Sequence, residues 1–566
     1  MVQNKFFEEV KKSLNDAIGE EIDEKLIEIP PDSKLGDYAF PCFSLAKKFK
    51  KAPQMIATEL KDKIKFNENL ISEIKTIGPY INFFINKKEF SKNILNEIND
   101  KKEKYASEDN KDYTVMIESP GPNTNKPLHL GHVRNMLLGN SIQNIYNFLG
   151  YKTVHVDIVN NRGVHICKSM LAYHKFGNNS EPDKKPDHFV GDYYVKYAKA
   201  EKEHPEMEEE IQEMLKKWEE NDPETRALWQ KMNDWCLVGM KTTYDRYGVK
   251  MDKPYYESEH YVKGRDIALN ALKNGIFEKN EKGDIIVDFE KEKLGKKVIL
   301  RANGTSVYMT QDLVLAKLRY EDYEMDKLIY IVGAPQSYHF QVLFKIFEKL
   351  DFHFAKDCFH LAYGMVKLPD GKMKSREGNV VDADNLADDM HFVSKKEIQK
   401  RHPEIDEKEL EKRAESIGMG AIKFFVLKFD AMKDFVFNPK ESLSFEGETG
   451  PYVQYTYARI SSILRKYGKE VTEEINFNNL NDSFDIVKLM SRLNETVKKS
   501  AEDHKPSYIC RYLLDLCKLF NEYYHNNKIL QDDKELEKAR IHLIKQIQTI
   551  LGIGMNLIGM QPIEEM

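Results

Sequence analysis

The stretch from residue 113 to residue 140, which reads YTVMIESPGPNTNKPLHLGHVRNMLLGN, places the strongest constraint on the fold. Residues 113–118 alternate in polarity and include β-branched side chains, which predicts a buried strand. A loop rich in glycine and proline follows, and an apolar periodicity from Leu130 onward predicts a helix. A strand, such a loop and a helix N-terminus together suit a phosphate site in an α/β sheet, because free N–H groups and the helix dipole attract an anion.

Two histidines belong to the predicted first turn of that helix. His129 and His132 are three residues apart and therefore share one face of the helix. Gly131 between them has no side chain, so a flat base can approach the backbone closely. The pattern predicts a nucleotide site with two proton donors directed at a phosphate. A chance occurrence of the four residues remains an alternative. A zinc site is a weaker one, because no further Cys or His stands nearby at ligand spacing, and no structural metal is predicted.

Composition narrows the class of protein. A chain of 566 residues is too long for one core, so roughly two to four domains are expected. No apolar run approaches the ~20 residues that span a bilayer, and the charged N-terminal segment lacks the core of a signal peptide. The six cysteines form no CxxC pair, which favours reduced core thiols. We therefore expect a cytoplasmic protein without membrane association. The net charge of −6 neither favours nor excludes nucleic-acid binding.

Changes in composition predict four regions. They are a small α/β domain at 1–108, a nucleotide-binding α/β domain at 109–390, a helical connector at 391–445 and a helical bundle at 446–566. The highly charged residues 178–245 have a helical pattern and are predicted to be an insertion in the α/β domain, although a merely solvated face remains an alternative. Residues 100–111 are predicted to be a linker. Four apolar residues of the first region are predicted to be core: Phe40, Phe43, Leu45 and Phe49.

Further strands are predicted at residues 153–159, 298–301 and 328–332, as a continuation of the same sheet. Ligands of open parallel sheets bind at the carboxyl ends of the strands. Three polar segments follow predicted strands or stand near them and are therefore candidate ligand positions, although ordinary loop chemistry remains an alternative for each. They are residues 256–258, 308–312 and 336–339.

A cationic loop and two mixed segments complete the pattern. Residues 372–376 read KMKSR between two glycines, and such a loop suits the neutralisation of a polyphosphate as it leaves, with an exposed turn as the alternative.

Aromatic and basic residues interleave in 450–469 and 511–530, which suits stacking on unpaired bases. Packing at helix junctions would give the same composition.

The HLGH at 129–132 and the KMKSR at 372–376, in this order, resemble the two signatures of class I aminoacyl-tRNA synthetases. Over essentially its whole length the chain is similar to the arginyl-tRNA synthetase family. Four further segments carry that resemblance: GDYAFP, GPYINFF, SVYMTQD and FEGETGPYVQYTYARI. Their order along the chain makes the resemblance specific.

The resemblance implies an architecture and a reaction. The architecture is a small N-terminal α/β domain that packs on the tRNA elbow, a Rossmann-like (HUP-type) parallel-sheet catalytic domain with an inserted connective peptide, and an all-α anticodon-binding bundle. The reaction activates L-arginine with ATP, as its Mg²⁺ complex, and transfers it to the terminal adenosine of tRNA(Arg). Members of the family are commonly monomeric and need bound tRNA before they activate the amino acid.

The resemblance also implies catalytic residues. His129 and His132 would donate to the ATP phosphates, and Lys372 would stabilise the leaving pyrophosphate. The ATP would further contact Gly131, Met373, Lys374, Ser375 and Arg376. The usual second signature, KMSKS, has a second lysine where this chain has Ser375. Lys126, just before the histidine motif, is predicted to substitute for it.

Arginine and tRNA are assigned positions in the same way. The guanidinium-binding positions of the family fall on Glu257, Tyr308 and Asp312, and the positions that hold the α-amino group fall on Asn123 and Gln336. Carboxylates suit a planar cation because they accept its forked donors in pairs. The positions that contact tRNA fall on Tyr80 and Asn82 for the D-loop, and on Tyr452, Tyr455 and Arg459 for the anticodon side.

Three alternatives remain. A class I synthetase of another specificity, such as cysteine, glutamine or lysine, would share both signatures. A cysteine enzyme needs a zinc site, for which the sequence offers no matching set, whereas a lysine pocket would also be acidic. A smaller nucleotidylyltransferase would lack the helical bundle. A non-catalytic tRNA-binding paralogue would have lost the histidines or Lys372, and both are present.

Overall fold

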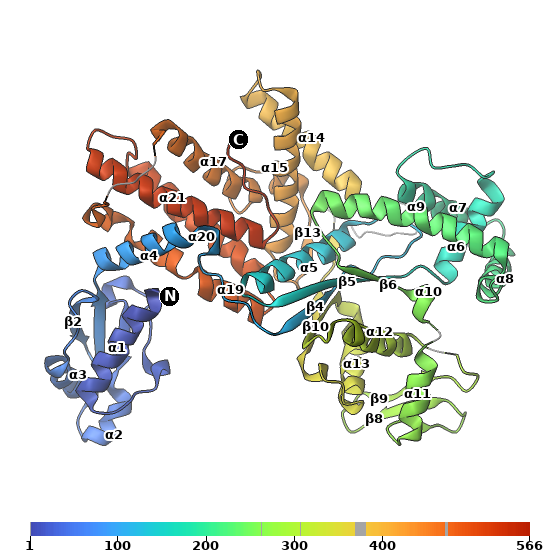
Figure 1. Ribbon diagram of the computed structural model, residues 1–566, viewed down its shortest axis with the longest axis horizontal. Coiled ribbons are helices and arrows are strands. Elements are labelled where there is room, and N and C mark those ends of the chain that lie inside the picture. Colours follow the sequence, from blue (N-terminus) through green and yellow to red (C-terminus); the bar gives the residue numbers. More distant parts are fainter. Residues whose placement is uncertain (1, 262, 306, 368–380, 470–473) are drawn as a thin grey trace.

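The computed structural model describes residues 2–261, 263–305, 307–367, 381–469 and 474–566. A parallel sheet lies at the centre of an elongated molecule (Figure 1). A bundle of C-terminal helices and the small N-terminal domain lie at one end, and a group of inserted helices lies at the other.

The central sheet has five strands, and every neighbouring pair in it is parallel. In spatial order the strands are β11 (Cys358–Tyr363), β10 (Lys327–Gly333), β4 (Thr114–Glu118), β5 (Lys152–Val159) and β6 (Lys253–Tyr256). The chain turns from β4 toward β5 and β6 on one side and places β10 and β11 on the other, so the strand order reverses between β4 and β10. Ligand crevices form at such a reversal, outside the carboxyl ends of the strands. The predicted Rossmann-like class is confirmed.

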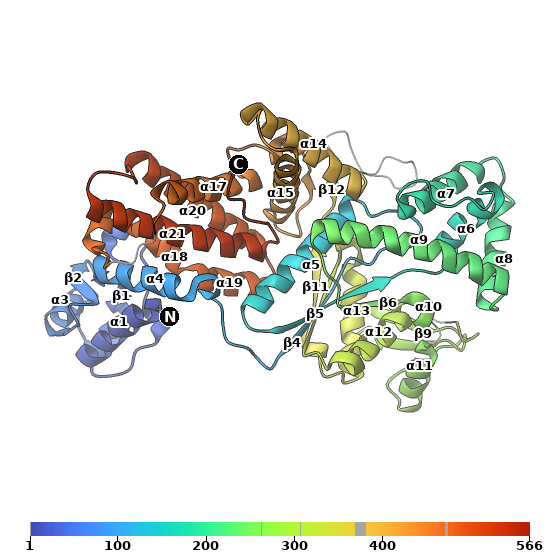
Figure 2. The same cartoon turned by 45° about the horizontal axis from the view of Figure 1, so that its top comes forward.

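The central strand β4 is buried on both faces. Val115 and Ile117 pack with helix α5 (Leu130–Phe148), whereas Met116 faces the helices α12 (Tyr308–Tyr323) and α13 (Ser337–Lys349) on the other side. In Figure 2, α5 lies between the sheet and the C-terminal helices. Because α5 is the next helix after β4 and is joined to it by the loop 119–129, its N-terminus lies at the carboxyl edge of the sheet.

Residues 298–301 do not continue the parallel sheet, so that prediction is wrong. They overlap β9 (Gly295–Leu300), which pairs antiparallel with β8 (Ile285–Phe289) in a separate sheet completed by β7 (Glu278–Lys279). The connection between β8 and β9 is short enough for a hairpin, whereas a parallel pair needs a crossover of about a dozen residues or more. An apolar alternation identifies a strand but not its partner.

The N-terminal region contains a three-stranded antiparallel sheet covered by helices. Its elements are α1 (Val2–Ile18), β1 (Tyr38–Pro41), α2 (Ala46–Phe49), α3 (Pro53–Lys63), β2 (Ile71–Ile77) and β3 (Tyr80–Ile85). Phe40 is fully buried, but Phe43 is 56% exposed and packs edge-on against Tyr80, so its core assignment is wrong. The predicted linker at 100–111 is wrong in its first part, because α4 (Lys87–Lys101) and the 3-10 turn η4 (Lys102–Lys104) extend into it.

Most of the remaining chain is helical. The inserted region and its neighbours comprise α6 (Val164–Phe176), α7 (Pro186–Ala200), α8 (Met207–Glu219), α9 (Pro223–Tyr247), α10 (Glu257–His260) and α11 (Gly264–Lys273). The inserted helices are not merely a solvated face, because Tyr197, Trp218 and Tyr247 are fully buried among them. Tyr197 and Tyr247 belong to the same hydrophobic core as the buried residues of α5.

The C-terminal part confirms the predicted all-α bundle. Its helices are α14 (Ala383–Arg401), α15 (Glu407–Leu427), α16 (Pro439–Ser442), α17 (Gly450–Tyr467), α18 (Phe484–Ser491), α19 (Leu493–Glu502), α20 (Ser507–Asn526) and α21 (Lys534–Leu557). A short parallel pair, β12 (Val366–Lys367) with β13 (Phe435–Val436), connects the segment between α15 and α16 to the end of the sheet domain. Ser141 of α5 donates to the Leu557 carbonyl of α21 at 2.9 Å, so the bundle is also attached to the central helix.

Two general predictions concern cysteines and membranes. The cysteines are free thiols, and all except Cys358 are fully buried. In the part of the chain that the structure describes, no helix has the length and apolarity needed to cross a membrane.

Candidate active site

A cleft of about 720 Å³ lies at the carboxyl ends of the central strands, where the strand order reverses. Glu118 ends β4 and Gly333 ends β10, and both line this cleft. The first turns of α5, α12 and α13 supply most of the remaining polar lining. Six of the predicted site residues line it together: His129, Gly131, His132, Tyr308, Asp312 and Gln336.

The two histidines are held by the backbone of their own turn. The Gly131 N–H donates to His129 Nδ1 at 3.1 Å, and the His129 N–H donates to His132 Nδ1 at 3.2 Å. The rings lie 3.9 Å apart between centroids. Because each Nδ1 accepts a hydrogen bond, the neutral form of each ring carries its proton on Nε2.

Burial makes this neutral form the stable one. It lowers the pKa of His129 to about 4, and the nearby positive charge of Lys126 acts in the same direction. Burial also lowers the pKa of His132 well below its ordinary value, with further contributions from His129 and Lys126. The pair therefore offers two N–H donors without positive charge at neutral pH.

Gly131 is required for the position of the His129 ring. A Cβ atom at residue 131 would lie 2.9 Å from Cε1 and 3.1 Å from Nδ1 of His129. Distances below about 3.0 Å force a neighbour to move, so any side chain here displaces the imidazole. Steric contact with the His129 ring therefore explains why residue 131 is a glycine, which the sequence alone did not reveal.

Lys126 lines a smaller cavity next to the main cleft, together with His129, His188 and Asp382. Its charge lowers the pKa of both motif histidines, so it lies within electrostatic reach of them. The predicted catalytic lysine is therefore adjacent to the histidine pair, although it does not line the main cleft in the described part of the chain.

The chain on both sides of residues 368–380 borders the cleft. Gly364, Met365 and Val366 line it before that segment. After the segment, the Leu130 N–H donates to the Val381 carbonyl at 3.0 Å, next to the bridge between His129 and Asp382. The predicted residues Lys372, Met373, Lys374, Ser375 and Arg376 lie outside the described residues.

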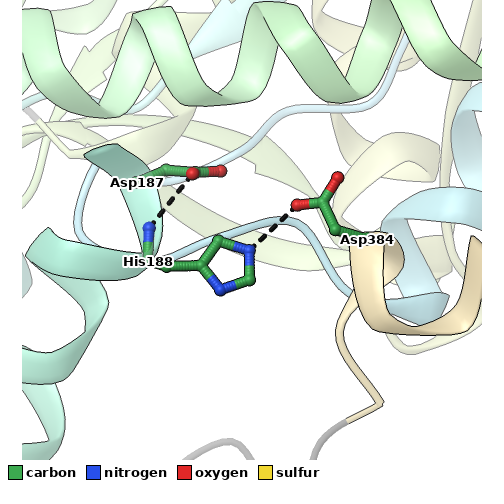
Figure 3. Close-up of side chains that lie close together, drawn as sticks. All are labelled: Asp187, His188 and Asp384. Carbon is green, nitrogen blue, oxygen red and sulfur yellow. Dashed lines mark hydrogen bonds and ion pairs between the residues drawn. The ribbon is translucent and has the colours of Figure 1, made fainter. Parts of the chain in front are cut away.

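A polar cluster beside Lys126 joins the inserted helices to α14 (Figure 3). His188 Nε2 lies 2.9 Å from Asp384 Oδ2, and the His188 N–H donates to Asp187. The hydrogen bond to Asp384 raises the pKa of His188. These three residues could in principle hold a cation. However, the Lys185 ammonium already contacts Asp384 at 2.7 Å and Asp187 at 2.9 Å, so the cluster supplies its own positive charge.

Two carboxylates occupy the other side of the site. Asp312, in the second turn of α12, accepts a hydrogen bond from His339 Nε2 at 2.6 Å when that nitrogen carries the proton. Glu257 begins α10, and its Oε1 lies 3.7 Å from Arg162 Nη1. Burial raises the pKa of Glu257, Arg162 opposes this, and Asp312 adds to the rise, so the two carboxylates are close enough to interact.

The remaining predicted arginine positions differ in exposure. Tyr308 is 80% exposed at the start of α12, and Gln336 lies in the 3-10 turn η5 (Ala334–Gln336) after β10. Asn123 forms an isolated β-bridge with Asn160. Asn160 lines the cleft, whereas Asn123 does not. Asn123 and Glu257 thus stand just outside the lining in the described structure.

The structure adds residues that the sequence reading missed. Glu118, at the end of the central strand, lines the cleft and forms a buried ion pair with Arg319 of α12. Its position at the carboxyl end of a predicted strand was a usable signal. His339 belongs to the segment 336–339, which the sequence indicates as a candidate ligand position, whereas no local pattern marks Arg162 or its contact with Glu257.

The predicted tRNA-binding residues lie far from the cleft. On β3, Tyr80 is partly exposed, whereas the Asn82 side chain is 2% exposed. On α17, Arg459 lies over the Tyr455 ring at 4.7 Å, and Asn521 of α20 contacts both Arg459 and Tyr452. A second cleft of about 560 Å³ lies here, with a basic and aromatic lining that includes Arg459, Lys466, Tyr524 and Lys528.

Comparisons with family models cover nearly the whole chain. Residues 4–85 match the arginyl tRNA synthetase N terminal domain, residues 93–439 match the catalytic domain of tRNA synthetases class I (R), and residues 453–566 match the DALR anticodon binding domain. These three models follow one another in the order that the fold shows.

Curated relatives and solved structures agree with the models. The arginine–tRNA ligase of Treponema denticola is 44% identical over 94% of this chain and 93% of its own length, and that of Bacteroides thetaiotaomicron is 42% identical over 99% of both. The structure of Thermus thermophilus arginyl-tRNA synthetase superposes with a TM-score of 0.83 at 24% identity, over 98% of this chain and 99% of that one. The Plasmodium falciparum arginyl-tRNA synthetase gives 0.78 at 22% identity, over 99% and 98%.

Proposed function

The chain belongs to the arginyl-tRNA synthetase family, and from that premise we propose how its cleft performs the reaction. The protein is an arginine–tRNA ligase, which uses ATP to form arginyl-adenylate and then transfers the arginine to tRNA(Arg). One observation carries the assignment of the site: a single cleft has paired neutral imidazoles on one wall and a carboxylate, Asp312, on another. The first suits a phosphate and the second suits a guanidinium.

The imidazoles act on the ATP. In the first step an arginine carboxylate oxygen bonds to the α-phosphorus, the bond from that phosphorus to the bridging oxygen breaks, and pyrophosphate leaves. His129 and His132 donate from Nε2 to phosphate oxygens, whose negative charge shifts as the bonds change. A fixed donor of this kind is worth about 3 to 4 kcal/mol in the transition state.

Lysines neutralise the leaving pyrophosphate in this proposal. Lys126 is supported by its electrostatic reach to both histidines. Lys372, with Met373, Lys374, Ser375 and Arg376, is assigned on the resemblance alone. ATP enters as its Mg²⁺ complex, with its base against Gly131. Lys126→Ala retaining a near-normal activation rate would refute the role of Lys126.

The carboxylates select arginine. Asp312 and Glu257 accept from the guanidinium, Tyr308 closes the pocket, and Asn123 and Gln336 hold the α-amino group. A lysine side chain has a compact ammonium that cannot satisfy two forked acceptors, so it would leave a buried carboxylate underpaired. The expected discrimination is therefore against lysine as well as against neutral amino acids.

In this proposal the elbow and the anticodon side of the tRNA bind outside the cleft, whereas its terminal adenosine enters the cleft. Tyr80, which is partly exposed, and Asn82, which is 2% exposed, contact the D-loop. Tyr452, Tyr455 and Arg459 contact the anticodon side. The protein acts as a monomer in the cytoplasm in this proposal.

ATP–pyrophosphate exchange with each proteinogenic amino acid, with and without total tRNA, tests the function. Exchange with arginine alone, and only with tRNA present, is the expected result. Exchange with another amino acid would overturn the assignment of Asp312 and Glu257. The absence of any exchange would favour a non-catalytic tRNA-binding protein.

A further inference from the structure

The loop at residues 160–163 contacts both the inserted helices and the start of α10, which come much later in the sequence. It follows β5 and enters α6, and it lies between the inserted helices and the start of α10. The Asn161 side chain donates to Ser258 Oγ and accepts from the Ser258 N–H, both at 3.0 Å. On the other side, Trp229 Nε1 of α9 donates to the Asn161 carbonyl at 2.6 Å.

Arg162 makes the same connection with charges. Its Nη1 lies 3.7 Å from Glu257 Oε1 in α10, and its Nη2 lies 2.7 Å from Glu219 Oε1 at the end of α8. The guanidinium stacks on Tyr261 at 3.9 Å and also lies near Trp218 of α8, at 5.5 Å from the ring centroid. The side chain is only 12% exposed, so these contacts determine its position.

The contact with Glu257 is unusual because Arg162 carries the same group as the substrate. Glu257 is one of the two carboxylates proposed to bind the substrate guanidinium, and Arg162 engages one of its oxygens. The distance of 3.7 Å between Nη1 and Oε1 is that of an ion pair and exceeds that of a hydrogen bond, so both oxygens can still accept from a substrate guanidinium. Arg162 therefore leaves the acceptor available while restricting its orientation.

We infer that Arg162 is a positioning residue of the arginine pocket, through which the inserted helices α8 and α9 hold Glu257 in place. This inference rests on the proposed function of Glu257. It gives the charged insertion a role in amino-acid binding that is independent of any contact with tRNA. Arg162 acts through Glu257 and takes no part in bond making.

Arg162 also affects the charge of Glu257. Burial raises the pKa of this carboxyl, Arg162 and a hydrogen bond from Gln311 oppose the rise, and Asp312 adds to it. Those groups come from the loop after β5 and from α12, the elements that face Glu257. Without Arg162 the pKa rises further, so a smaller fraction of Glu257 is ionised. Since the guanidinium pairs with the ionised form, arginine binding weakens, and more so as the pH falls.

Kinetics of four single variants test the inference in the full-length protein. The variants are Arg162→Met, Arg162→Lys, Glu219→Gln and Glu257→Gln, with Glu220→Gln as the matched control. Glu220 follows Glu219 directly and pairs with Lys216 at 3.9 Å instead. The measured quantities are kcat and the KM values for arginine and ATP in tRNA-dependent exchange, at mildly acidic and mildly basic pH, together with the thermal midpoint of each variant.

Arg162→Met is expected to raise the arginine KM by about tenfold, the scale of one lost polar contact, while the ATP KM stays within about twofold. The rise should be larger at acidic than at basic pH. Arg162→Lys should recover part of the loss, because it keeps the charge but not the fork. Glu219→Gln should have a smaller effect in the same direction, and Glu220→Gln none.

Other outcomes separate the inference from the function on which it rests. An arginine KM that is unchanged in Arg162→Met, or one that rises equally with the ATP KM, overturns the inference. A rise without any pH dependence also overturns it, because a structural defect alone would give that result. Failure of Glu257→Gln to change the arginine KM, or failure of the unmodified protein to activate arginine, would instead refute the proposed function.

Discussion

The two sides of the cleft are built in different ways. On the side proposed to bind phosphate, His129 and His132 have lowered pKa values and accept hydrogen bonds from N–H groups of the same helical turn. On the side proposed to bind arginine, Asp312 and Glu257 are acidic and contact His339 and Arg162, which come from other elements. Each side uses the charge state that suits its ligand.

This difference follows from the chemistry of the two ligands. A phosphate carries its own charge, so fixed dipoles can bind it, and the lysines of the proposal act on the pyrophosphate as it leaves. A guanidinium requires anionic acceptors, and a buried carboxylate remains ionised only when donors surround it. The arginine side therefore depends on long-range side-chain contacts, whereas the phosphate side depends on one turn of helix.

The largest effect is expected from the phosphate side. His132→Ala should lower kcat by about a hundredfold or more while the arginine KM changes little, because a donor that acts on the transition state is removed. Single-turnover formation of the adenylate measures it. A loss confined to the arginine KM would contradict the proposed separation of the two sides.

On the arginine side, Asp312→Ala should raise the arginine KM by at least about tenfold, because one acceptor of the guanidinium is lost. The ATP KM should remain near its original value. Glu321→Gln on the same helix is the matched control, since its exposed side chain pairs with Lys317 at the far end of α12. An unchanged arginine KM in Asp312→Ala would refute the assignment.

The same contrast explains what the sequence could predict. The strand β4, the loop and the start of α5 were predictable, because periodicity and Gly/Pro signals are local. The start of α12 was not, since Val307 precedes it and valine is a poor N-cap; the Thr310 hydroxyl accepts from the Val307 N–H instead. Similarly, β9 was recognisable as a strand, but its partner was not.

The residues of the site were predictable to the same extent, that is, only where the signal was local in the sequence. The histidine pair is encoded by neighbouring residues, whereas Arg162 and Glu257 lie on opposite sides of the insertion in the sequence and meet only in the folded structure. Likewise, Glu118 is acidic at the end of a strand, but its partner Arg319 could be found only from packing. Long-range side-chain contacts leave no local pattern.

Gly131→Ala tests whether the phosphate side really depends on its own turn. The added Cβ would lie 2.9 Å from the His129 ring and force a small shift, so the adenylate should form about tenfold more slowly, which is less than the roughly hundredfold cost of a 1 Å misplacement. Gly552→Ala in α21 is the matched control. Its Cβ would lie 3.7 Å from the side chain of Tyr457 in α17, which is an ordinary van der Waals distance. Equal rates for the two variants would show that the His129 ring can move without loss.

The smallest effect is expected from pH, and it differs between the two sides. The pKa of His129 is lowered to about 4, so the imidazoles stay neutral as the pH passes through about 6.5, where an ordinary histidine titrates. The rate of adenylate formation at saturating arginine should therefore be flat there. The pKa of Glu257 is raised by burial, so its ionised form is lost as the pH falls, and the arginine KM should rise on the acidic side. A saturated rate that falls as the pH drops through about 6.5, together with a constant arginine KM, would contradict both assignments. The imidazoles would then titrate in this range, and the ionisation of Glu257 would not affect arginine binding.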